Sequence, residues 1–395
     1  MTVPSLKSTN LFKPIQIGNI TLNQRIAHLP TTRFRATAEH VPTDLMLQYY
    51  TERSIVPGTL LIGEGTIPSE KLGILPNLPG LWNEQQSKAW KIIIDSVHKN
   101  GSFISIQLGT LGRAANPAIL KQRGYEYSGA SVIYLDEDSK KLAEDVGNPL
   151  KELTEDEIHD IVVNQIPNSV KLSLQAGFDI VEIHASSGYL FEQFIHPSSN
   201  KRTDKYGGSI ENRTRFLLEV IDNLIYNEGI DAKKLAIRLS PYNTFRGSLG
   251  ENESVHPIVN YGYLVSELQQ RANKGHQLGY ISVVENTPER SNTDFISQIW
   301  QGVIVKSIAF SESFDLNPVV KAVDTDDRTI IGFGRHFIAN PDLIERLKNS
   351  LDLNPFDPPT FYSGTNLGYN TYSKYGQPLE IDQEAEKLHR GKSLV

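Results

Sequence analysis

An alternation of short apolar runs with helical patterns, repeated eight times, constrains the fold of this chain more than any other feature. Several runs are apolar throughout, as parallel strands covered on both faces are. The clearest helical repeat spans residues 212–227, where Phe216, Val220 and Leu224 lie at i, i+4 and i+8. Eight strand–helix units predict a (β/α)8 barrel. The expected strands are 26–30, 59–65, 102–109, 178–185, 235–241, 279–285, 303–310 and 329–335, and the expected helices are 44–54, 84–99, 155–175, 212–227, 258–273, 292–300, 315–323 and 341–349.

The 395 residues are expected to form a single barrel domain with additions at three places. PIQIGNITL, with Gly18 and Asn19 at its turn, predicts a hairpin within residues 1–25 that caps the amino-terminal end of the barrel. Residues 110–154 form an insertion after the third expected strand, and residues 355–395 form a tail. A chain of this length often divides into two or three domains, but barrels commonly reach it through loop insertions.

Composition and charge argue against several classes of partner. The chain has no cysteine, so disulfides, thiolate metal sites and thiol catalysis are excluded. Its net charge is −7 with acids and bases interspersed, which argues against nucleic acid or an anionic membrane as a main partner. The first residues lack the apolar core of a signal peptide, and no run approaches the roughly 18 apolar residues of a membrane helix. We therefore expect a cytoplasmic protein, and we expect no metal site.

A barrel carries its functional residues where its strands end, at the carboxyl-terminal mouth. The fourth expected strand ends near His184, and Ser187 and Tyr189 follow within one turn. Two donors and a phenol in this place can hold an oxyanion and supply a proton. A lone histidine at a strand end is more often structural, so the interpretation depends on the residues around it.

Two other expected strands carry polar residues near their ends. Arg238 lies inside the apolar run LAIRLSP, where an unpaired charge would cost several kcal/mol. It therefore needs an anionic partner, which is either a bound anion or a glutamate of the barrel. Gln107 closes the run SFISIQLG, and its amide can both donate and accept, although a glutamine there is more often a structural hydrogen-bonding residue.

Residues 181–215, VEIHASSGYLFEQFIHPSSNKRTDKYGGSIENRTR, resemble the Old Yellow Enzyme family of flavin-dependent ene-reductases. The stretch LFKPIQIGNITLNQRIAHLPTTRFRA is similar to the family's N-terminal pattern, with Pro30, Thr32, Arg33 and Arg35 in matching places, and other matches cover nearly the whole chain. The resemblance implies bound FMN, NADPH or NADH as the reductant, and small enones or enals as substrates. It allows a homodimer.

For FMN, the resemblance implies contacts from the ends of several strands. Gln107 would bind the pyrimidine edge of the flavin, and Arg238 would face the charge of its reduced form. The Thr32 hydroxyl would donate to flavin O4. Gly334 and Arg335 would hold the phosphate just before a helix that begins near Pro341. The complete expected set is Pro30, Thr32, Gly65, Gln107, Arg238, Ser307, Ile308, Gly334 and Arg335.

For catalysis, the resemblance implies that His184 and Ser187 hold the carbonyl oxygen of the substrate while Tyr189 protonates its α-carbon. Gly109 stands where close family members carry a bulky aromatic residue, which opens the pocket, and the loop ENTPERSNTDF after the sixth strand looks shorter than theirs. The expected substrate-binding residues are His184, Ser187, Phe245 and Tyr362, with Phe361 as a further candidate wall.

Two places depart from the family pattern. Ser187 replaces the asparagine or histidine that serves as the second donor. Lys306-Ser307-Ile308-Ala309 replaces Arg-Ala-Gly-Gly or Arg-Ala-Gly-Asn, so a branched side chain takes the place of a glycine that lets backbone approach the phosphate. Lys306 and Ser307 would compensate in part.

These departures keep two alternatives open. One is a catalytically weakened relative with poor FMN retention that acts as a binding or regulatory protein. The other is a (β/α)8 lyase, aldolase or isomerase that binds a phosphorylated substrate through Arg335 without flavin. The second alternative lacks an obvious Schiff-base lysine or a pair of carboxylates, and it leaves the 181–215 block unexplained.

Overall fold

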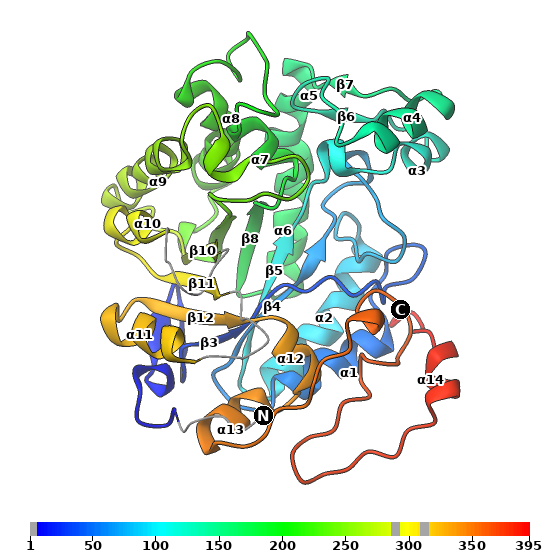
Figure 1. The fold of residues 1–395 in the computed structure, drawn as a ribbon, viewed down its shortest axis with the longest axis vertical. Helices are drawn as coiled ribbons and strands as arrows, with labels where there is room; N and C mark the ends of the chain where they lie inside the picture. Colours follow the sequence, from blue (N-terminus) through cyan, green and yellow to red (C-terminus); the bar gives the residue numbers. More distant parts are fainter. Residues whose placement is uncertain (1–5, 286–292, 309–315) are drawn as a thin grey trace.

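Figure 1 shows the computed structural model, in which eight parallel strands close into a barrel surrounded by helices. The structure describes residues 6–285, 293–308 and 316–395, without the side chain of Ile308. Each expected apolar run overlaps one barrel strand, so the predicted (β/α)8 fold is confirmed. The strands are β3 (Ile26–His28), β4 (Leu60–Thr66), β5 (Phe103–Leu108), β8 (Ile180–Ala185), β9 (Leu235–Leu239), β10 (Tyr280–Glu285), β11 (Ile304–Ile308) and β12 (Thr329–Phe333).

Helices follow the strands as the alternating pattern predicts. The helix expected at 155–175 is interrupted by a π-helical turn at Ile161–Gln165, just before Pro167. Proline has no N–H to donate to the residue four places earlier, and the wider turn accommodates that gap. The outer helices are α1 (Asp44–Arg53), α2 (Glu84–Lys99), α5 (Glu155–Asp160), α6 (Ile166–Ala176), α8 (Ile210–Asp222), α9 (Pro257–Asn273), α10 (Asp294–Ile299), α11 (Asn317–Thr325), α12 (Arg335–Ala339) and α13 (Leu343–Asn349).

One helix was not expected at the end of the barrel. The last apolar run was expected to continue to residue 335, but β12 ends at Phe333, and α12 begins at Arg335. The helix expected from Pro341 begins at Leu343 as α13. The last strand is thus followed by two short helices, and Arg335 is the first residue of α12.

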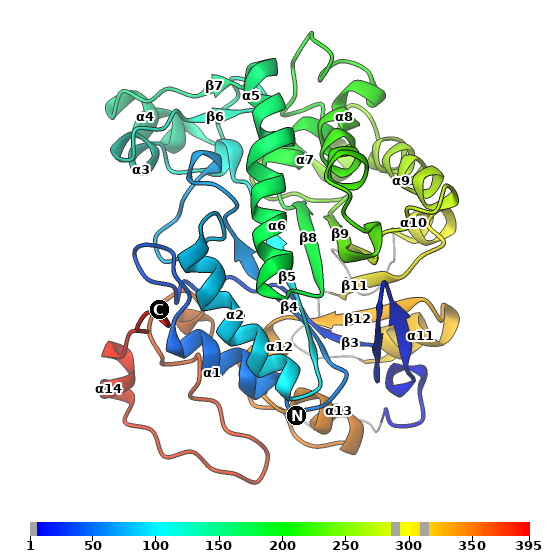
Figure 2. The same ribbon diagram turned by 180° about the vertical axis from the view of Figure 1, so that it is seen from behind.

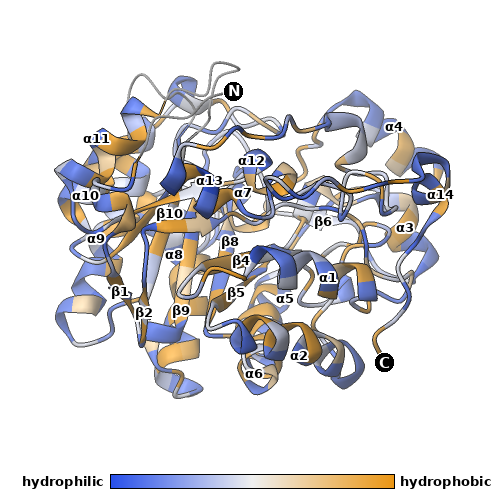
Figure 3. Cartoon of the chain, turned by 90° about the horizontal axis from the view of Figure 1, so that it is seen from below, coloured by the Kyte–Doolittle hydropathy of each residue, from blue (hydrophilic) through white to orange (hydrophobic). Residues whose placement is uncertain are grey.

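The apolar faces of the helices pack against the barrel. Trp90, Ile93, Ile94 and Val97 of α2 are all fully buried, at a spacing that places them on one side of the helix. They belong to one large cluster with the strand residues that face outward. Figure 3 shows hydrophobic strands in the interior and hydrophilic residues on the outer helices. The burial of one such isoleucine contributes about 2 kcal/mol.

The N-terminal hairpin consists of β1 (Ile15–Ile17) and β2 (Ile20–Leu22) and is visible in blue in Figure 2. Its turn needs glycine, because Gly18 has φ +51° and a Cβ atom there would lie 2.3 Å from Lys233 O. Ile17 and Leu22 pack with Ile180 and Tyr280, the first residues of their strands. The hairpin therefore covers the amino-terminal end of the barrel, opposite the mouth.

Two further segments lie outside the strand–helix alternation. The 110–154 segment holds α3 (Pro117–Gln122), β6 (Ser128–Gly129), α4 (Glu137–Asp145) and β7 (Lys151–Glu152). The tail includes α14 (Gln383–Leu388) and returns to α1, where the N–H of Asp44 donates to Lys392 O at 3.0 Å. Among the helices in the described ranges, none is long and apolar enough to cross a membrane.

Two buried arginines attach the tail to the loop after β3. Arg33 and Arg35 are each 1% exposed. Arg33 donates to the carbonyls of Phe361 and Gly368, and Arg35 donates from Nε to Thr365 O at 2.8 Å and from Nη2 to Thr360 O at 2.9 Å. Burial and the nearby Arg33 charge lower the pKa of Arg35 to about 10, which still leaves it charged at neutral pH. Backbone carbonyls thus replace the water that these guanidiniums lose.

Arg35→Met should lower the free energy of unfolding by about 3 kcal/mol or more, because several buried carbonyls lose their donor. Urea unfolding measures the loss, and limited proteolysis should show faster cleavage within residues 360–395. Arg390→Met is the matched control, since Arg390 is exposed in the same tail and should change stability by less than about 0.5 kcal/mol. Equal stability of Arg35→Met and the wild type would contradict the role of this arginine.

Candidate active site

A cavity with a volume of about 820 Å³ opens at the carboxyl-terminal ends of the strands. Its size falls within the range of roughly 300–1,000 Å³ that is typical of sites for small molecules. The loops after β3 and β4, the ends of β5, β8 and β9, the start of α12 and the tail all contribute to its lining. Most of the residues expected at the site lie here: Pro30, Thr32, Gly65, Gln107, His184, Ser187, Tyr189, Arg238, Gly334, Arg335 and Tyr362.

Three expected residues are not among the lining. Phe245 is 67% exposed on the loop after β9, and the adjacent Arg246 lines the cavity instead. Ser307 is buried in β11, where its hydroxyl has no hydrogen-bond partner among the described residues. Ile308 ends β11, but its side chain and the following Ala309 lie outside the described residues. Most of the loop ENTPERSNTDF, at 286–292, also lies outside them.

The pairing of the strands places the polar residues of the mouth side by side. Gly65 pairs with Gln107, Gln107 pairs with Glu182, and His184 pairs with Arg238. Gln107 Nε2 donates to Glu182 Oε1 at 2.6 Å, and Arg238 Nη1 donates to the Ser282 hydroxyl at 2.9 Å. The hydrogen bonds therefore follow from the register of neighbouring strands.

Arg238 is 9% exposed and has no carboxylate within 4 Å among the described residues. Burial lowers its pKa, and the nearby Glu182 charge opposes that change. Burial also raises the pKa of Glu182, and the Arg238 charge opposes that change. The sequence predicted either a barrel glutamate or a bound anion as the partner of Arg238. Glu182 is near but forms no direct ion pair with Arg238, and the guanidinium also faces the cavity.

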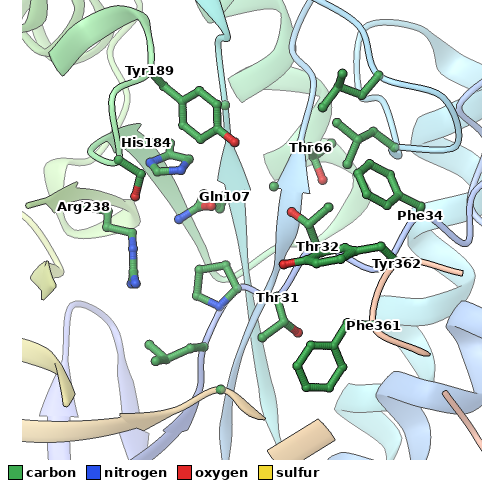
Figure 4. Close-up of a pocket in the computed structure, with 18 of the residues that line it drawn as sticks. Thr31, Thr32, Phe34, Thr66, Gln107, His184, Tyr189, Arg238, Phe361 and Tyr362 are labelled. Atoms are coloured by element: carbon green, nitrogen blue, oxygen red, sulfur yellow. The ribbon is translucent and has the colours of Figure 1, made fainter. Parts of the chain in front are cut away.

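His184, Ser187 and Tyr189 meet at one side of the cavity, where Figure 4 shows His184 and Tyr189 next to each other above Gln107 and Arg238. The rings of His184 and Tyr189 are 4.9 Å apart between centroids and stand edge to face. Ser187 has φ +61°, in the left-handed region that asparagine adopts more readily than most residues. The backbone at this position would therefore suit an asparagine.

Ser186, which was not among the expected site residues, contacts the imidazole of His184. Its hydroxyl lies 2.9 Å from His184 Nδ1, and its side chain is fully buried. His184 Nε2 has no hydrogen-bond partner in the described part of the chain. Burial, with the charges of Arg238 and Arg246, keeps the pKa of His184 well below its usual 6.5, so the ring is neutral at neutral pH.

A second unexpected residue, Glu192, supports the turn that carries Ser187. Its fully buried carboxylate accepts the N–H of Gly188 and the hydroxyls of Ser240 and Tyr261. The Ser240 hydroxyl in turn accepts the N–H of Ser187 at 2.8 Å. One buried carboxylate therefore joins the turn after β8 to the loop after β9. Its position in the short helix α7 (Leu190–Ile195) gave no sign of this role.

The cavity offers the donors and the space that FMN needs. Gly65 leaves a gap between two polar groups, since a Cβ atom there would lie 3.6 Å from Gln107 Oε1 and 3.7 Å from Thr32 Oγ1. Arg238 supplies a cation with spare donors, and Arg335 has no carboxylate within 4 Å in the described ranges. On β11, however, Lys306 forms ion pairs with Asp294 and Glu285. The donor set therefore fits the flavin ring, and Arg335, at the start of α12, could hold the phosphate.

Comparison with known proteins agrees with this chemistry. The model of the NADH:flavin oxidoreductase / NADH oxidase family matches residues 10–354. A probable NADPH dehydrogenase of Candida albicans is 48% identical over 95% of both chains, and enoate reductase 1 of Kluyveromyces lactis is 39% identical over 95% of this chain and 96% of its own. The crystal structure of Old Yellow Enzyme from Pichia sp. AKU4542 is 45% identical, with a TM-score of 0.94 over 99% of this chain and 100% of its own. The chain is an oxidoreductase that uses FMN and NAD(P)H, and it belongs to the Old Yellow Enzyme family.

Proposed function

We propose that this enzyme reduces the C=C bond of α,β-unsaturated carbonyl compounds. The observation that carries the proposal is the convergence of His184, Tyr189, Gln107 and Arg238 on one cavity at the mouth of the barrel. Gln107, Arg238, Thr32 and Gly65 would hold the flavin ring, and Gly334 with Arg335 would hold the phosphate. Bound FMN supplies the acceptor for hydride from NAD(P)H and the donor of hydride to the alkene.

In this proposal, His184 binds the carbonyl oxygen of the substrate. Negative charge grows on that oxygen as the β-carbon gains a hydride, so a donor placed there lowers the barrier. Tyr189 then gives its proton to the α-carbon. Burial raises the pKa of Tyr189, and Arg246 opposes this only in part. The phenol therefore stays protonated across neutral pH and can serve as the donor.

The Ser186 hydroxyl sets which nitrogen of His184 carries the proton. Nδ1 is its single hydrogen-bond partner among the described residues, so a buried O–H would remain unsatisfied unless it donates to Nδ1. A neutral imidazole that accepts at Nδ1 carries its hydrogen on Nε2. His184 is then a hydrogen-bond donor toward the cavity, which is the state that a carbonyl oxygen requires.

In Ser186→Ala, His184 should no longer be held in the tautomer that carries its hydrogen on Nε2. In ¹⁵N spectra of histidine-labelled protein, His184 should show protonated Nε2 in the wild type and a mixture of tautomers in the variant. His40 provides an internal reference of the opposite kind, because its Nδ1 lies 2.7 Å from Leu78 O, an acceptor. Enone reduction should fall several-fold in the variant. An unchanged His184 tautomer would contradict the role of Ser186.

Ser187→Asn should raise the rate of cyclic enone reduction roughly fivefold or more, because it restores a second donor at the carbonyl oxygen. Oxidation of NADPH involves no such oxyanion and should change less. Tyr189→Phe should slow the enone step while leaving NADPH oxidation nearly intact. Stopped-flow measurement of the two half-reactions separates these effects, with Ser187→Ala as the control at the same position. Equal changes in both half-reactions would contradict the assignment of Ser187 to the carbonyl.

Arg238→Met should weaken FMN binding by about ten- to a hundredfold, since it removes the cation that faces the flavin while filling a similar volume. Visible absorbance of the bound flavin after dialysis measures retention. Arg123→Gln on the exposed surface makes the same change in net charge and should retain FMN. Unchanged retention in Arg238→Met would show that the guanidinium does not bind the flavin.

One observation supports the alternative of a catalytically weakened relative. Lys306, on the strand that faces the phosphate in other family members, is already paired with Glu285 and Asp294. In that case purified protein would be colourless and would gain no flavin absorbance on titration with FMN. A yellow protein that oxidises NADPH with cyclohexenone as acceptor supports the enzymatic function proposed above.

A further inference from the structure

Arg246 is the cation of the cavity that neither the flavin nor the proton transfer requires. Three arginines line the cavity, namely Arg238, Arg246 and Arg335, and no aspartate or glutamate lies among its described lining residues. Arg238 faces the proposed flavin ring and Arg335 the phosphate. Arg246 lies instead beside Tyr189, at the place where the substrate would be protonated.

Two contacts hold the guanidinium of Arg246, and two further features position its backbone and Cβ atom. Its Nη1 donates to Ser187 O at 2.9 Å, and its central carbon lies 4.4 Å from the centroid of the Tyr189 ring. Its own carbonyl accepts from Arg113 Nη2 at 2.9 Å. Gly188 makes room for it, since a Cβ atom there would come within 2.6 Å of Arg246 Cβ. The side chain is therefore fixed against the reaction site, unlike a surface arginine that moves freely in water.

In the described part of the chain, the remaining donors of Arg246 have no acceptor of opposite charge. Within the described ranges, no carboxylate lies within 4 Å of the Arg246 guanidinium. The guanidinium donates one hydrogen bond there, to the backbone carbonyl of Ser187. A guanidinium has five N–H groups in a planar arrangement that matches a carboxylate. A half-buried, oriented guanidinium with free donors at the edge of a cavity is thus suited to a bound anion.

Part of the remaining lining is apolar. Leu75, Leu78, Leu111 and Ile67 line the cavity together with the ring of Phe34. These side chains bind hydrocarbon and offer no polar partner. A substrate that combines an enone, a short aliphatic chain and a terminal charge would match both parts of the cavity.

We propose that Arg246 binds a carboxylate on the substrate, so that the enzyme prefers enones that carry an acidic side chain. The proposal rests on the enone reductase function proposed above and specifies its substrate class. The alkene gains a hydride at its β-carbon and the Tyr189 proton at its α-carbon, while the carboxylate is unchanged and serves only for binding.

The test compares (E)-6-oxohept-4-enoate with its methyl ester, because the two share one enone and differ in a charge that is not conjugated with it. The wild type should show a higher kcat/KM for the acid than for the ester. In Arg246→Gln the ratio of the two kcat/KM values should fall at least about tenfold, mainly through KM. Arg246→Lys keeps the charge and should retain part of the preference. Arg123→Gln, with the same change in net charge on the exposed surface, should leave the ratio unchanged.

The other outcomes are distinct. If the wild type reduces both compounds without preferring the acid, or if Arg246→Gln lowers both rates equally, the carboxylate site is wrong while the enone reductase function stands. If Arg246→Gln weakens NADPH but not NADH in the reductive half-reaction, with the acid-to-ester ratio unchanged, Arg246 binds the 2′-phosphate of the reductant and the substrate proposal is overturned. If the wild type reduces neither compound, the proposed function itself fails and the inference fails with it.

Discussion

The pairing of β12 with β3 is the interaction on which the rest of the site depends. Gly332 pairs with Ala27 and Phe333 with His28, and these contacts join the last strand to the first. Gly332 is needed there, because a Cβ atom would come within 2.3 Å of the Leu29 side chain. Closure brings the loop that carries Thr32 and the helix that carries Arg335 to the same opening, although about 300 residues separate them in sequence.

Buried charge is arranged in a consistent way around this opening. The cations reach the cavity, whereas the carboxylates of Glu182 and Glu192 lie behind it and bind neighbouring side chains and backbone. Such an arrangement gives the cavity a positive potential that attracts an anionic cofactor. Burial of the His184 ring, together with the charges of the nearby arginines, lowers its pKa and keeps it neutral.

Much of the fold and part of the site could be predicted from the sequence. Continuous apolar runs identified all eight barrel strands because parallel strands are buried on both faces. Residues near the carboxyl-terminal ends of these strands, such as Gln107 and His184, were correctly expected at the mouth of the barrel. This expectation did not extend to loops. Phe245 and Arg246 are adjacent after β9, and no periodicity indicates which of the two side chains turns inward; the structure shows that Arg246, with φ +54°, lines the cavity.

Contacts between distant segments were also beyond the sequence pattern. Glu192 was missed because its partners Ser240 and Tyr261 come from the loop after β9 and from α9, and only the folded barrel brings them together. Ser186 was missed for a different reason. It lies two residues from His184, but whether its hydroxyl reaches the ring depends on the path of the turn rather than on spacing.

The attachment of the tail by Arg33 and Arg35 bears on the order in which the enzyme is assembled. Phe361 and Tyr362 form a wall of the cavity, and they follow every barrel strand in the chain. During synthesis, which proceeds from the amino terminus, the barrel can therefore close while its mouth still lacks that wall. The two arginines lack their carbonyl partners in the tail until residues 360–368 emerge. A nascent barrel thus exposes its arginine-rich opening to the surroundings, and the final segment both encloses the site and supplies carbonyl acceptors to the arginines beneath it.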